Sequence, residues 1–274
     1  MTHVTSGIHP TAVIHPTAEL DATVTVGPYA VIGAGVQIGA DTSVGAHAVI
    51  EGPTEIGAAC TIHPFAALGG PPQDLHYKGE PTRLLIGCGN IIREFVTFNR
   101  GTPRGGGETI IGDDNLFMAY AHVAHDCHVG SHVIMANAAT LGGHVTVGDR
   151  AVLGGLVAVH QFVRIGGFAM IGGGAIVTQD VPPYVNAAGN RARMFGLNLI
   201  GLKRQGFSSE TISALKSAYR LLFRSAGLTF KKRVDQVEAQ FGQVPEVKTL
   251  LEFVEVSDRG LCQGRWEKRG GLLS

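Results

Sequence analysis

Half of the histidines in this chain lie in one short stretch of the sequence. The chain has 274 residues and twelve histidines. Six of them fall between positions 122 and 160: His122, His125, His128, His132, His144 and His160. Imidazole changes its charge near neutral pH, so it serves as a general acid or base and as a metal ligand. One histidine alone carries little weight, but a group of histidines that meet in space would indicate a reactive site.

Two chemistries suit such a group. Three neutral imidazoles could hold a zinc ion and leave a fourth position open for water. Alternatively, one imidazole could act as a general base on a hydroxyl group. His125 is the best candidate for that base, because Asp126 follows it directly and its carboxylate could orient the ring. An aspartate that simply favours a turn explains Asp126 equally well.

The element that positions these histidines is a repeat of six residues. This period fits neither the 3.6-residue turn of an α-helix nor the alternation of a simple strand. A hexapeptide repeat predicts a parallel β-helix, in which three hexapeptides form one coil of eighteen residues. The apolar positions of the repeat form two registers: Ile8, Ile14, Leu20, Val26, Ile32, Ile38, Val44, Ile50, Ile56, Ile62 and Leu68, then Ile111, Phe117, Val123, Val129, Met135, Leu141, Val147, Leu153, Val159, Ile165, Ile171 and Val177.

The eighteen-residue coil decides which histidines are neighbours. Residues eighteen positions apart lie one above the other, with the spacing of about 4.8 Å found between paired strands. His122, His125, His144 and His160 fall within three residues of one such column. We therefore expect these four to cluster at one corner over three coils, with His128 and His132 elsewhere.

Two segments break the repeat and should project from it. Residues 69–84 contain three prolines and residues 100–109 contain three consecutive glycines, so both are predicted loops. Insertions in a repeat protein commonly build the binding site on one face.

After residue 189 the pattern changes. Val181-Pro182-Pro183 should end the repeat, since proline has no N–H to donate to the ladder. A linker is expected around residues 189–206, followed by three helices that begin near Ser208, before Val234 and at Pro245. Residues after 260 should be frayed. We thus predict a β-helix over residues 1–189, with loops at 69–84 and 100–109, and a helical domain over 190–274.

The net charge differs between the same two parts of the chain. Residues 1–189 hold 7 Lys and Arg against 14 Asp and Glu, and residues 190–274 hold 15 against 8. The basic second part suggests an acidic partner, and an ordinary solvated helix surface explains it equally well. We expect the four cysteines to be free, since they form no CxxC pair and two occupy small inward positions. We find no signal peptide and no apolar run long enough for a membrane span, and expect a cytoplasmic protein.

Several strings of the sequence closely resemble the UDP-N-acetylglucosamine O-acyltransferases of lipid A biosynthesis. The resemblance covers nearly the whole chain. The strings are PQDL at 72–75, GEPT at 79–82, AHVAHDC at 121–127, AVHQF at 158–162, QDVPPY at 179–184 and GLKR at 201–204.

The resemblance implies an all-β, left-handed parallel β-helix with a C-terminal α-helical domain, assembled as a homotrimer with sites between subunits. It implies transfer of a 3-hydroxyacyl group from acyl carrier protein to the 3-hydroxyl of UDP-N-acetylglucosamine, the first step of lipid A biosynthesis. It implies no metal, no cofactor and no nucleic-acid partner.

The resemblance also implies roles for individual residues. His125 matches the general base, Asp126 its support, and Gly143 the residue whose amide stabilises the oxyanion. Gly173 matches the position that limits acyl length, and as glycine it should leave room for a long chain. The remaining substrate-binding positions are Asp74, His76, His122, His144, His160, Gln161, Arg191, Asn198 and Arg204.

The chain departs from the better-known members at four positions of the sugar-nucleotide site: His76, Arg191, Ile200 and Gln205. A 3-amino analogue of the sugar therefore stays open as the acceptor, and the acyl length is not fixed. Two rival functions also stay open. One is a zinc hydratase of the γ-carbonic-anhydrase type, and the other is a structural solenoid without activity.

Overall fold

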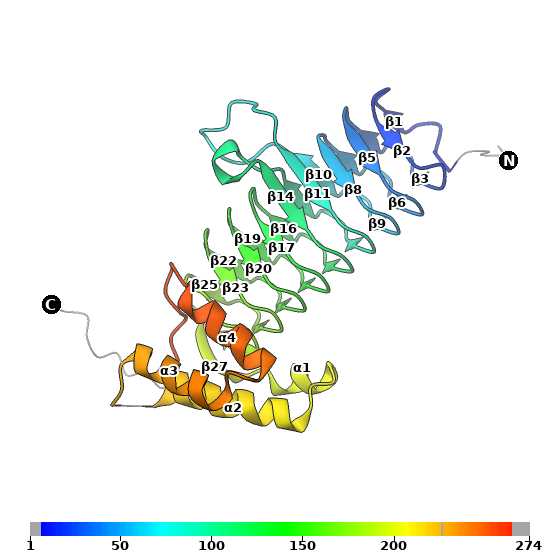
Figure 1. The fold of residues 1–274 in the computed structure, drawn as a ribbon. Helices are drawn as coiled ribbons and strands as arrows, with labels where there is room; N and C mark the ends of the chain where they lie inside the picture. Colours follow the sequence, from blue (N-terminus) through cyan, green and yellow to red (C-terminus); the bar gives the residue numbers. More distant parts are fainter. Residues whose placement is uncertain (1–6, 226, 265–274) are drawn as a thin grey trace.

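The chain winds into a long parallel β-helix that carries a group of helices at one end (Figure 1). The computed structural model describes residues 7–225 and 227–264. From β1 to β26 the strands pair in parallel with the strand one coil away, and most partners are eighteen residues apart, as Val13 and Val31 are. The hexapeptide repeat therefore predicted the coil correctly.

The coils stack three sheets along the axis, which we call the first, second and third sheets. The first contains β1 (Val13–Ile14), β4 (Val31–Ile32), β7 (Val49–Ile50), β10 (Ala67–Gly70), β13 (Thr97–Asn99), β16 (His122–Val123), β19 (Thr140–Leu141), β22 (Ala158–Val159) and β25 (Ile176–Val177). The second contains β2 (Glu19–Leu20), β5 (Val36–Ile38), β8 (Thr54–Ile56), β11 (Arg83–Ile86), β14 (Glu108–Ile111), β17 (His128–Val129), β20 (Thr146–Val147) and β23 (Arg164–Ile165). The third contains β3 (Thr25–Val26), β6 (Ser43–Val44), β9 (Thr61–Ile62), β12 (Ile91–Ile92), β15 (Leu116–Phe117), β18 (Ile134–Met135), β21 (Val152–Leu153), β24 (Met170–Ile171), β26 (Val185–Ala188) and β27 (Arg193–Leu197).

The interior is filled by the apolar residues of the repeat. From Val26 onward the two apolar registers are buried, while Ile8, Ile14 and Leu20 are only partly covered, since they lie in the first coil that the structure describes. The small residues that follow, such as Ala30 and Cys127, are buried as well and let the chain turn. No two of the four cysteines form a disulfide bond with each other.

Most corners of the coil use two residues, and from Tyr29 onward the second commonly has a positive φ even where it is not glycine. Asp126 and His144 both have φ 60°. The first residue of a corner needs no partner for its amide, which explains why prolines occupy it at positions 10, 16, 28 and 64. The backbone therefore leaves this N–H without a carbonyl partner, and at some corners, such as those of Cys88, Asp113 and Ser131, it donates to a side chain of the next coil instead.

Both predicted loops leave the β-helix at the corner between the first and second sheets, which we call the 1–2 corner. One comprises residues 71–82, and the other residues 100–107, which include the 3₁₀ helix η1 (Pro103–Gly105). The paired residues Ala67 and Thr97 are thirty positions apart, and Thr97 and His122 are twenty-five apart, instead of eighteen. The loops thus add 12 and 7 residues at one corner, and the sheets keep their pairing apart from one register shift between Leu68 and Gly70.

The corner between the third and first sheets, the 3–1 corner, carries a column of stacked rings on the surface. The rings belong to Tyr29, His47, Phe65, Phe95 and Tyr120, with neighbouring centroids 4.9–5.2 Å apart. Tyr29 and Tyr120 are 58% and 60% exposed, and Leu156, farther along the same corner, is 70% exposed. So large an exposed apolar ridge is typical of an interaction surface.

The C-terminal part corrects two expectations. The expected linker contains the strand β27, which pairs antiparallel with β26, and the helix α1 (Leu199–Arg204). Residues 261–264 are not frayed, because Leu261 bridges to Asp180 and Gly264 to Met194. The β26–β27 hairpin spans the boundary predicted at 189/190. Both errors arose because turns and prolines mark where the repeat stops but not which strand pairs next.

The three predicted helices are confirmed. They are α2 (Ser209–Arg224), with Ser208 as its N-cap, α3 (Phe230–Phe241), and α4 (Pro245–Glu255), with proline in its first turn. In the described part of the chain, no helix is both long enough and apolar enough to cross a bilayer.

We predict that truncating an inward side chain destabilises the fold far more than truncating its outward neighbour. In β5, Ile38 is 3% exposed, whereas Gln37 faces outward. Ile38→Ala should lower the free energy of unfolding by about 2–5 kcal/mol, because it removes buried carbons and leaves a cavity. Gln37→Ala, the control, should change it by less than about 0.5 kcal/mol. Urea denaturation followed by circular dichroism measures both, and equal losses would contradict the assignment of the inward face.

Candidate active site

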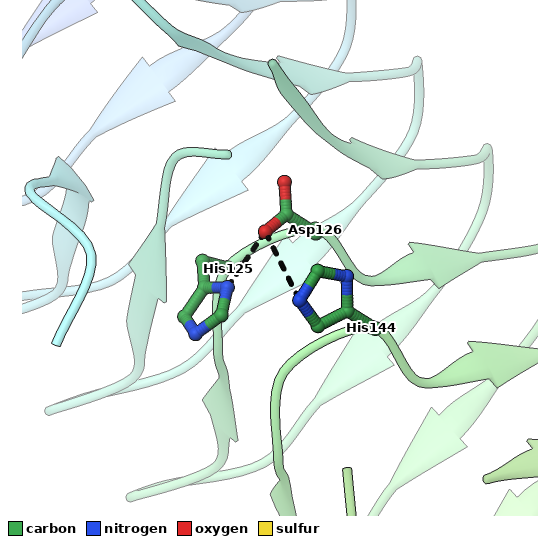
Figure 2. Close-up of side chains that lie close together, drawn as sticks. All are labelled: His125, Asp126 and His144. Atoms are coloured by element: carbon green, nitrogen blue, oxygen red, sulfur yellow. Dashed lines mark hydrogen bonds and ion pairs between the residues drawn. The ribbon is translucent and has the colours of Figure 1, made fainter. Parts of the chain in front are cut away.

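The 1–2 corner brings together the residues best suited to chemistry. His125, Asp126 and His144 lie there on successive coils, beside the two loops (Figure 2). The stacking of coils placed them together, as the eighteen-residue spacing predicted.

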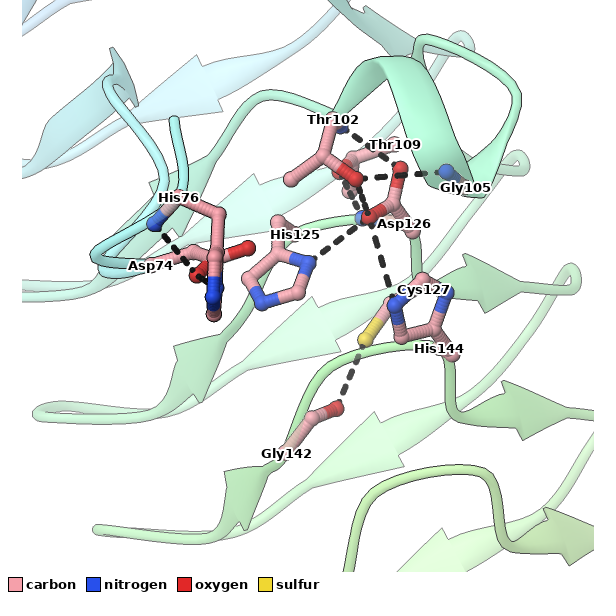
Figure 3. A network of polar contacts seen from close by, with 10 residues as sticks. All are labelled: Asp74, His76, Thr102, Gly105, Thr109, His125, Asp126, Cys127, Gly142 and His144. Atoms are coloured by element: carbon pink, nitrogen blue, oxygen red, sulfur yellow. Dashed lines mark hydrogen bonds and ion pairs between the residues drawn. The ribbon is translucent and has the colours of Figure 1, made fainter. Parts of the chain in front are cut away.

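Asp126 is fixed from several sides by the second loop. Its Oδ1 accepts the backbone N–H of Thr102 at 2.7 Å, and its Oδ2 accepts the Thr102 hydroxyl at 2.7 Å. Its own N–H donates to Oγ1 of Thr109 at 2.8 Å. The residue is 5% exposed. The loop over residues 100–107 therefore holds this carboxylate in one orientation (Figure 3).

Asp126 in turn orients His125. Its Oδ2 lies 2.7 Å from Nδ1 of His125. An ionised carboxylate can only accept, so Nδ1 carries the proton and Nε2 of a neutral ring keeps its lone pair. The side chain of His125 is 15% exposed, so this nitrogen can be reached from outside the corner.

The charge on Asp126 is stabilised by its partners. Burial alone would raise the pKa of this carboxyl, but the hydrogen bonds from His125 and Thr102, with the nearby His144, outweigh it and lower the pKa. Asp126 is therefore ionised at neutral pH and can stabilise an imidazolium beside it.

His144 and His122 complete the group. The ring of His144 meets that of His125 edge-on, with centroids 5.2 Å apart, and stacks on Phe162 at 4.4 Å. Nδ1 of His122 lies 2.7 Å from the hydroxyl of Thr97. Burial lowers the pKa of both His122 and His144. Both rings are thus held neutral and can accept or donate hydrogen bonds.

Gly143 lies directly against the ring of His125. A Cβ added at this position would be 2.6 Å from Cε1 of His125, so any side chain would displace the ring. Gly143 is the first residue of its corner, and its N–H has no acceptor among the described residues. This places a spare backbone donor beside the imidazole.

Asp74 and His76 approach from the first loop (Figure 3). Oδ1 of Asp74 accepts the N–H of His76 at 2.9 Å and lies 3.0 Å from its Nδ1. These bonds are the main cause that lowers the pKa of Asp74, and the nearby His125 contributes. The loop thus adds a carboxylate to the edge of the histidine group.

His160 is on the expected corner but outside the group. Its Nδ1 lies 2.9 Å from a guanidinium nitrogen of Arg259, and with Arg191 these residues line a cavity of about 400 Å³. Gln161 lies in the column of His125 and Gly143. Arg259 escaped the sequence analysis because only the return of residues 256–264 to the β-helix brings it there.

Three predicted site residues lie on other corners of the same chain. Gly173 is at the 3–1 corner, between β24 and β25. Asn198 caps α1 and donates to the carbonyl of Phe168, at the corner between the second and third sheets. Arg204 ends that helix. One chain therefore does not bring them to His125.

The geometry of the group suits a hydrogen-bonded pair better than zinc. His125, Asp126 and His144 each offer a ligand atom, all within 4.8 Å of one another. Tetrahedral zinc with bonds of about 2.0 Å would set its ligand atoms roughly 3.3 Å apart. Nδ1 of His125 and Oδ2 of Asp126 are 2.7 Å apart, and Oδ2 also accepts a hydrogen bond from the Thr102 hydroxyl.

The chain is similar to known acyltransferases in sequence and in structure. A family model described as UDP N-acetylglucosamine O-acyltransferase, domain 2, matches residues 180–262, and one of bacterial transferase hexapeptide repeats matches 35–70 and 108–143. The acyl-[acyl-carrier-protein]–UDP-N-acetylglucosamine O-acyltransferase of Burkholderia lata is 51% identical over 196 residues, which cover 70% of this chain and 74% of that protein.

Solved structures agree. The UDP-N-acetylglucosamine O-acyltransferase of Moraxella catarrhalis superposes with a TM-score of 0.91 at 41% identity, over 94% of this chain and 100% of that one. The UDP-N-acetylglucosamine acyltransferase of Campylobacter jejuni gives 0.89 at 39%, over 94% and 100%. These neighbours and the repeats confirm the left-handed β-helix with a C-terminal helical domain.

We predict that His122 makes stability depend on pH. The unfolded imidazole takes up a proton near its ordinary pKa of about 6.5, whereas the folded one does so only at lower pH. The free energy of unfolding of the wild type should therefore fall as the pH drops below about 6.5. In His122→Gln, the loss between about pH 7.5 and 5.5 should be smaller. Urea denaturation at both pH values tests this, and an unchanged loss would contradict it.

Proposed function

This chain belongs to the UDP-N-acetylglucosamine O-acyltransferase family, and from that premise we propose that the 1–2 corner is its active site, with His125 as the general base. The enzyme transfers an acyl group from acyl carrier protein to an oxygen of UDP-N-acetylglucosamine in lipid A biosynthesis. The observation that supports the site best is the 2.7 Å contact between His125 and Asp126, which leaves Nε2 free to take a proton.

In the proposed reaction, Nε2 of His125 removes the proton of the acceptor hydroxyl while the oxygen attacks the thioester carbon. The new C–O bond gives a tetrahedral oxyanion. When it collapses, the C–S bond breaks, and the thiolate of the carrier takes the proton back from Nε2. Asp126 stabilises the transient imidazolium and holds the ring in the required tautomer.

The amide of Gly143 is the proposed donor to the oxyanion. It lies beside the ring and lacks an acceptor among the described residues. Pro16 occupies the equivalent corner position in the first coil, and proline has no N–H. The β-helix therefore does not require a hydrogen bond from the amide at this position. Such a preorganised donor in acyl transfer is worth about 10²–10³ in rate.

The neutral imidazoles of His122 and His144, with Asp74, His76 and Gln161, are the proposed contacts to the sugar. The proposed acceptor atom is the 3-hydroxyl and the proposed acyl group is a 3-hydroxyacyl chain; a 3-amino sugar is the alternative acceptor. The proposed docking surface for the acidic carrier protein is the group of positive charges on α1 and α2, made by Lys203, Arg204, Lys216, Arg220 and Arg224.

We propose a homotrimer whose sites lie between subunits. Gly173, Asn198 and Arg204 can join His125 only if another copy presents its other corners. The exposed ring column at the 3–1 corner offers an apolar surface for such a contact. In this proposal the β-helix supplies the catalytic corner and the helical domain, residues 190–274, binds the carrier and the nucleotide. The cytoplasmic location stays a prediction.

The two rival functions make different demands. A zinc hydratase requires stoichiometric metal that is lost together with activity, so metal analysis of the purified protein separates it from the acyltransferase. A structural solenoid predicts no turnover of any acyl thioester.

We predict that His125→Ala lowers kcat for acyl transfer by about 10²–10⁴-fold, the usual share of general acid–base catalysis. His128→Ala is the matched control, because His128 is exposed on the second sheet. Turnover is measured with acyl carrier protein thioester and UDP-N-acetylglucosamine, and oligomeric state by light scattering. If His125→Ala kept near-normal turnover as an intact oligomer, another residue would be the base.

We also predict that two inactive variants complement each other. His125→Ala and Arg204→Ala, coexpressed, should form mixed trimers in which about a quarter of the sites take an intact His125 and an intact Arg204 from different subunits. About a quarter of wild-type activity should return. The control mixes the same variants after separate assembly. No recovery in the coexpressed sample would mean that each site lies within one chain.

A further inference from the structure

A second group of polar residues lies at the 1–2 corner, on the coils that follow the histidine group toward the C-terminal end of the β-helix. It surrounds the cavity of about 400 Å³ mentioned above, which belongs to the last coils and the segment after α4. Its lining residues are His160, Thr178, Gln179, Arg191 and Arg259.

The charge of this cavity is not neutralised. It contains two guanidinium groups and no acidic side chain. Within residues 7–225 and 227–264, neither Arg191 nor Arg259 forms an ion pair with a carboxylate. By contrast, on earlier coils of the β-helix, Arg83 forms an ion pair with Glu108 and Arg93 forms one with Glu94. Two arginines without a carboxylate partner that line one cavity are suited to bind an anion. The N–H groups of their planar guanidinium groups match the geometry of phosphate oxygens.

Arg259 is held at the cavity by a fully buried carboxylate. Asp180 is 0% exposed, and its Oδ1 accepts the backbone N–H of Arg164, whereas its Oδ2 accepts the hydroxyl of Ser257 at 2.7 Å. Its backbone N–H donates to the carbonyl of Gly260, and its carbonyl accepts from Cys262. One residue of the last coil thus fixes the chain on both sides of Arg259.

We propose that Arg259 binds a phosphate group of a substrate, with Arg191 and His160 beside it, and that Asp180 is a positioning residue for Arg259. The proposal rests on the proposed function, because both substrates of that reaction carry phosphate. These are the diphosphate of the sugar nucleotide and the phosphodiester that joins pantetheine to the carrier protein.

Distance favours the phosphodiester. His160, which Arg259 contacts, lies about two coils from His125, and Gln179 lies three coils from it, or about 10 and 14 Å at the spacing of paired strands. The acceptor hydroxyl is only a few bonds from the nearer phosphate of the nucleotide. The thioester is separated from the carrier's phosphate by the whole pantetheine arm, which is long enough to reach the cavity.

The test compares two small donors that differ only in phosphate, acyl-phosphopantetheine and acyl-pantetheine. Arg259→Ala should lower kcat/KM for the first by about five- to tenfold and leave that for the second unchanged. Lys248→Ala, which removes one exposed positive charge from the same domain, is the control. A rise in KM for UDP-N-acetylglucosamine and a weaker Kd for UDP, with both donors affected equally, would assign the phosphate to the nucleotide instead.

The proposal is overturned if the wild type transfers acyl groups but Arg259→Ala behaves as Lys248→Ala does with every substrate. A wild type without acyl transfer would instead refute the proposed function. For the positioning role, Ser257→Ala removes one bond to Asp180 and should cause a smaller loss confined to the phosphate-bearing substrate. It should cause no further loss in Arg259→Ala, since coupled residues are not additive. If Ser257→Ala caused the same loss of kcat/KM in Arg259→Ala as in the wild type, Asp180 would have a structural role that does not act through Arg259.

Discussion

Every coil of this protein must close so that its strands meet the strands of the next coil in register. The backbone N–H and C=O groups of a short strand have no other partners in the interior, and leaving them unpaired costs free energy. Closure in eighteen residues satisfies them, and it also fixes the stacking of the corners. The positions of the histidines, the glycine beside the base and the exposed rings all follow from this requirement.

The geometry of the proposed active site depends on a second constraint added to the first. Asp126 occupies a corner position with positive φ, a conformation that few residues adopt readily. The coil imposes this backbone, and the loop over residues 100–107 then binds both oxygens of the side chain through Thr102. A rigid scaffold thus positions the carboxylate, the carboxylate positions the imidazole, and no large motion is needed to assemble the pair.

The sequence predicted the features that follow from the six-residue repeat. It missed the contacts made where later segments fold back onto the β-helix. The apolar registers indicated the coil, and the coil indicated that His125 and His144 meet. The caps at Ser208 and Pro245 indicated where α2 and α4 begin. The pairing of β27 with β26 and the contact of Arg259 with His160 join segments with no shared period, so spacing could not reveal them. His160 was expected with the other histidines, but its ring contacts Arg259. The positions of Gly173, Asn198 and Arg204 on other corners became visible only once the sheets were known.

The loops at the 1–2 corner show how such a protein can change during evolution. An insertion of arbitrary length within a strand would rotate every later residue away from its column, whereas the 12 and 7 extra residues at this corner leave the columns aligned. Indels are therefore tolerated at the corner that we propose as the active site. A duplicated coil, in contrast, would keep the register and lengthen the β-helix by about 4.8 Å. The fold thus separates two heritable variables: loop sequence can alter which molecule is recognised, and coil number can alter how long a molecule fits.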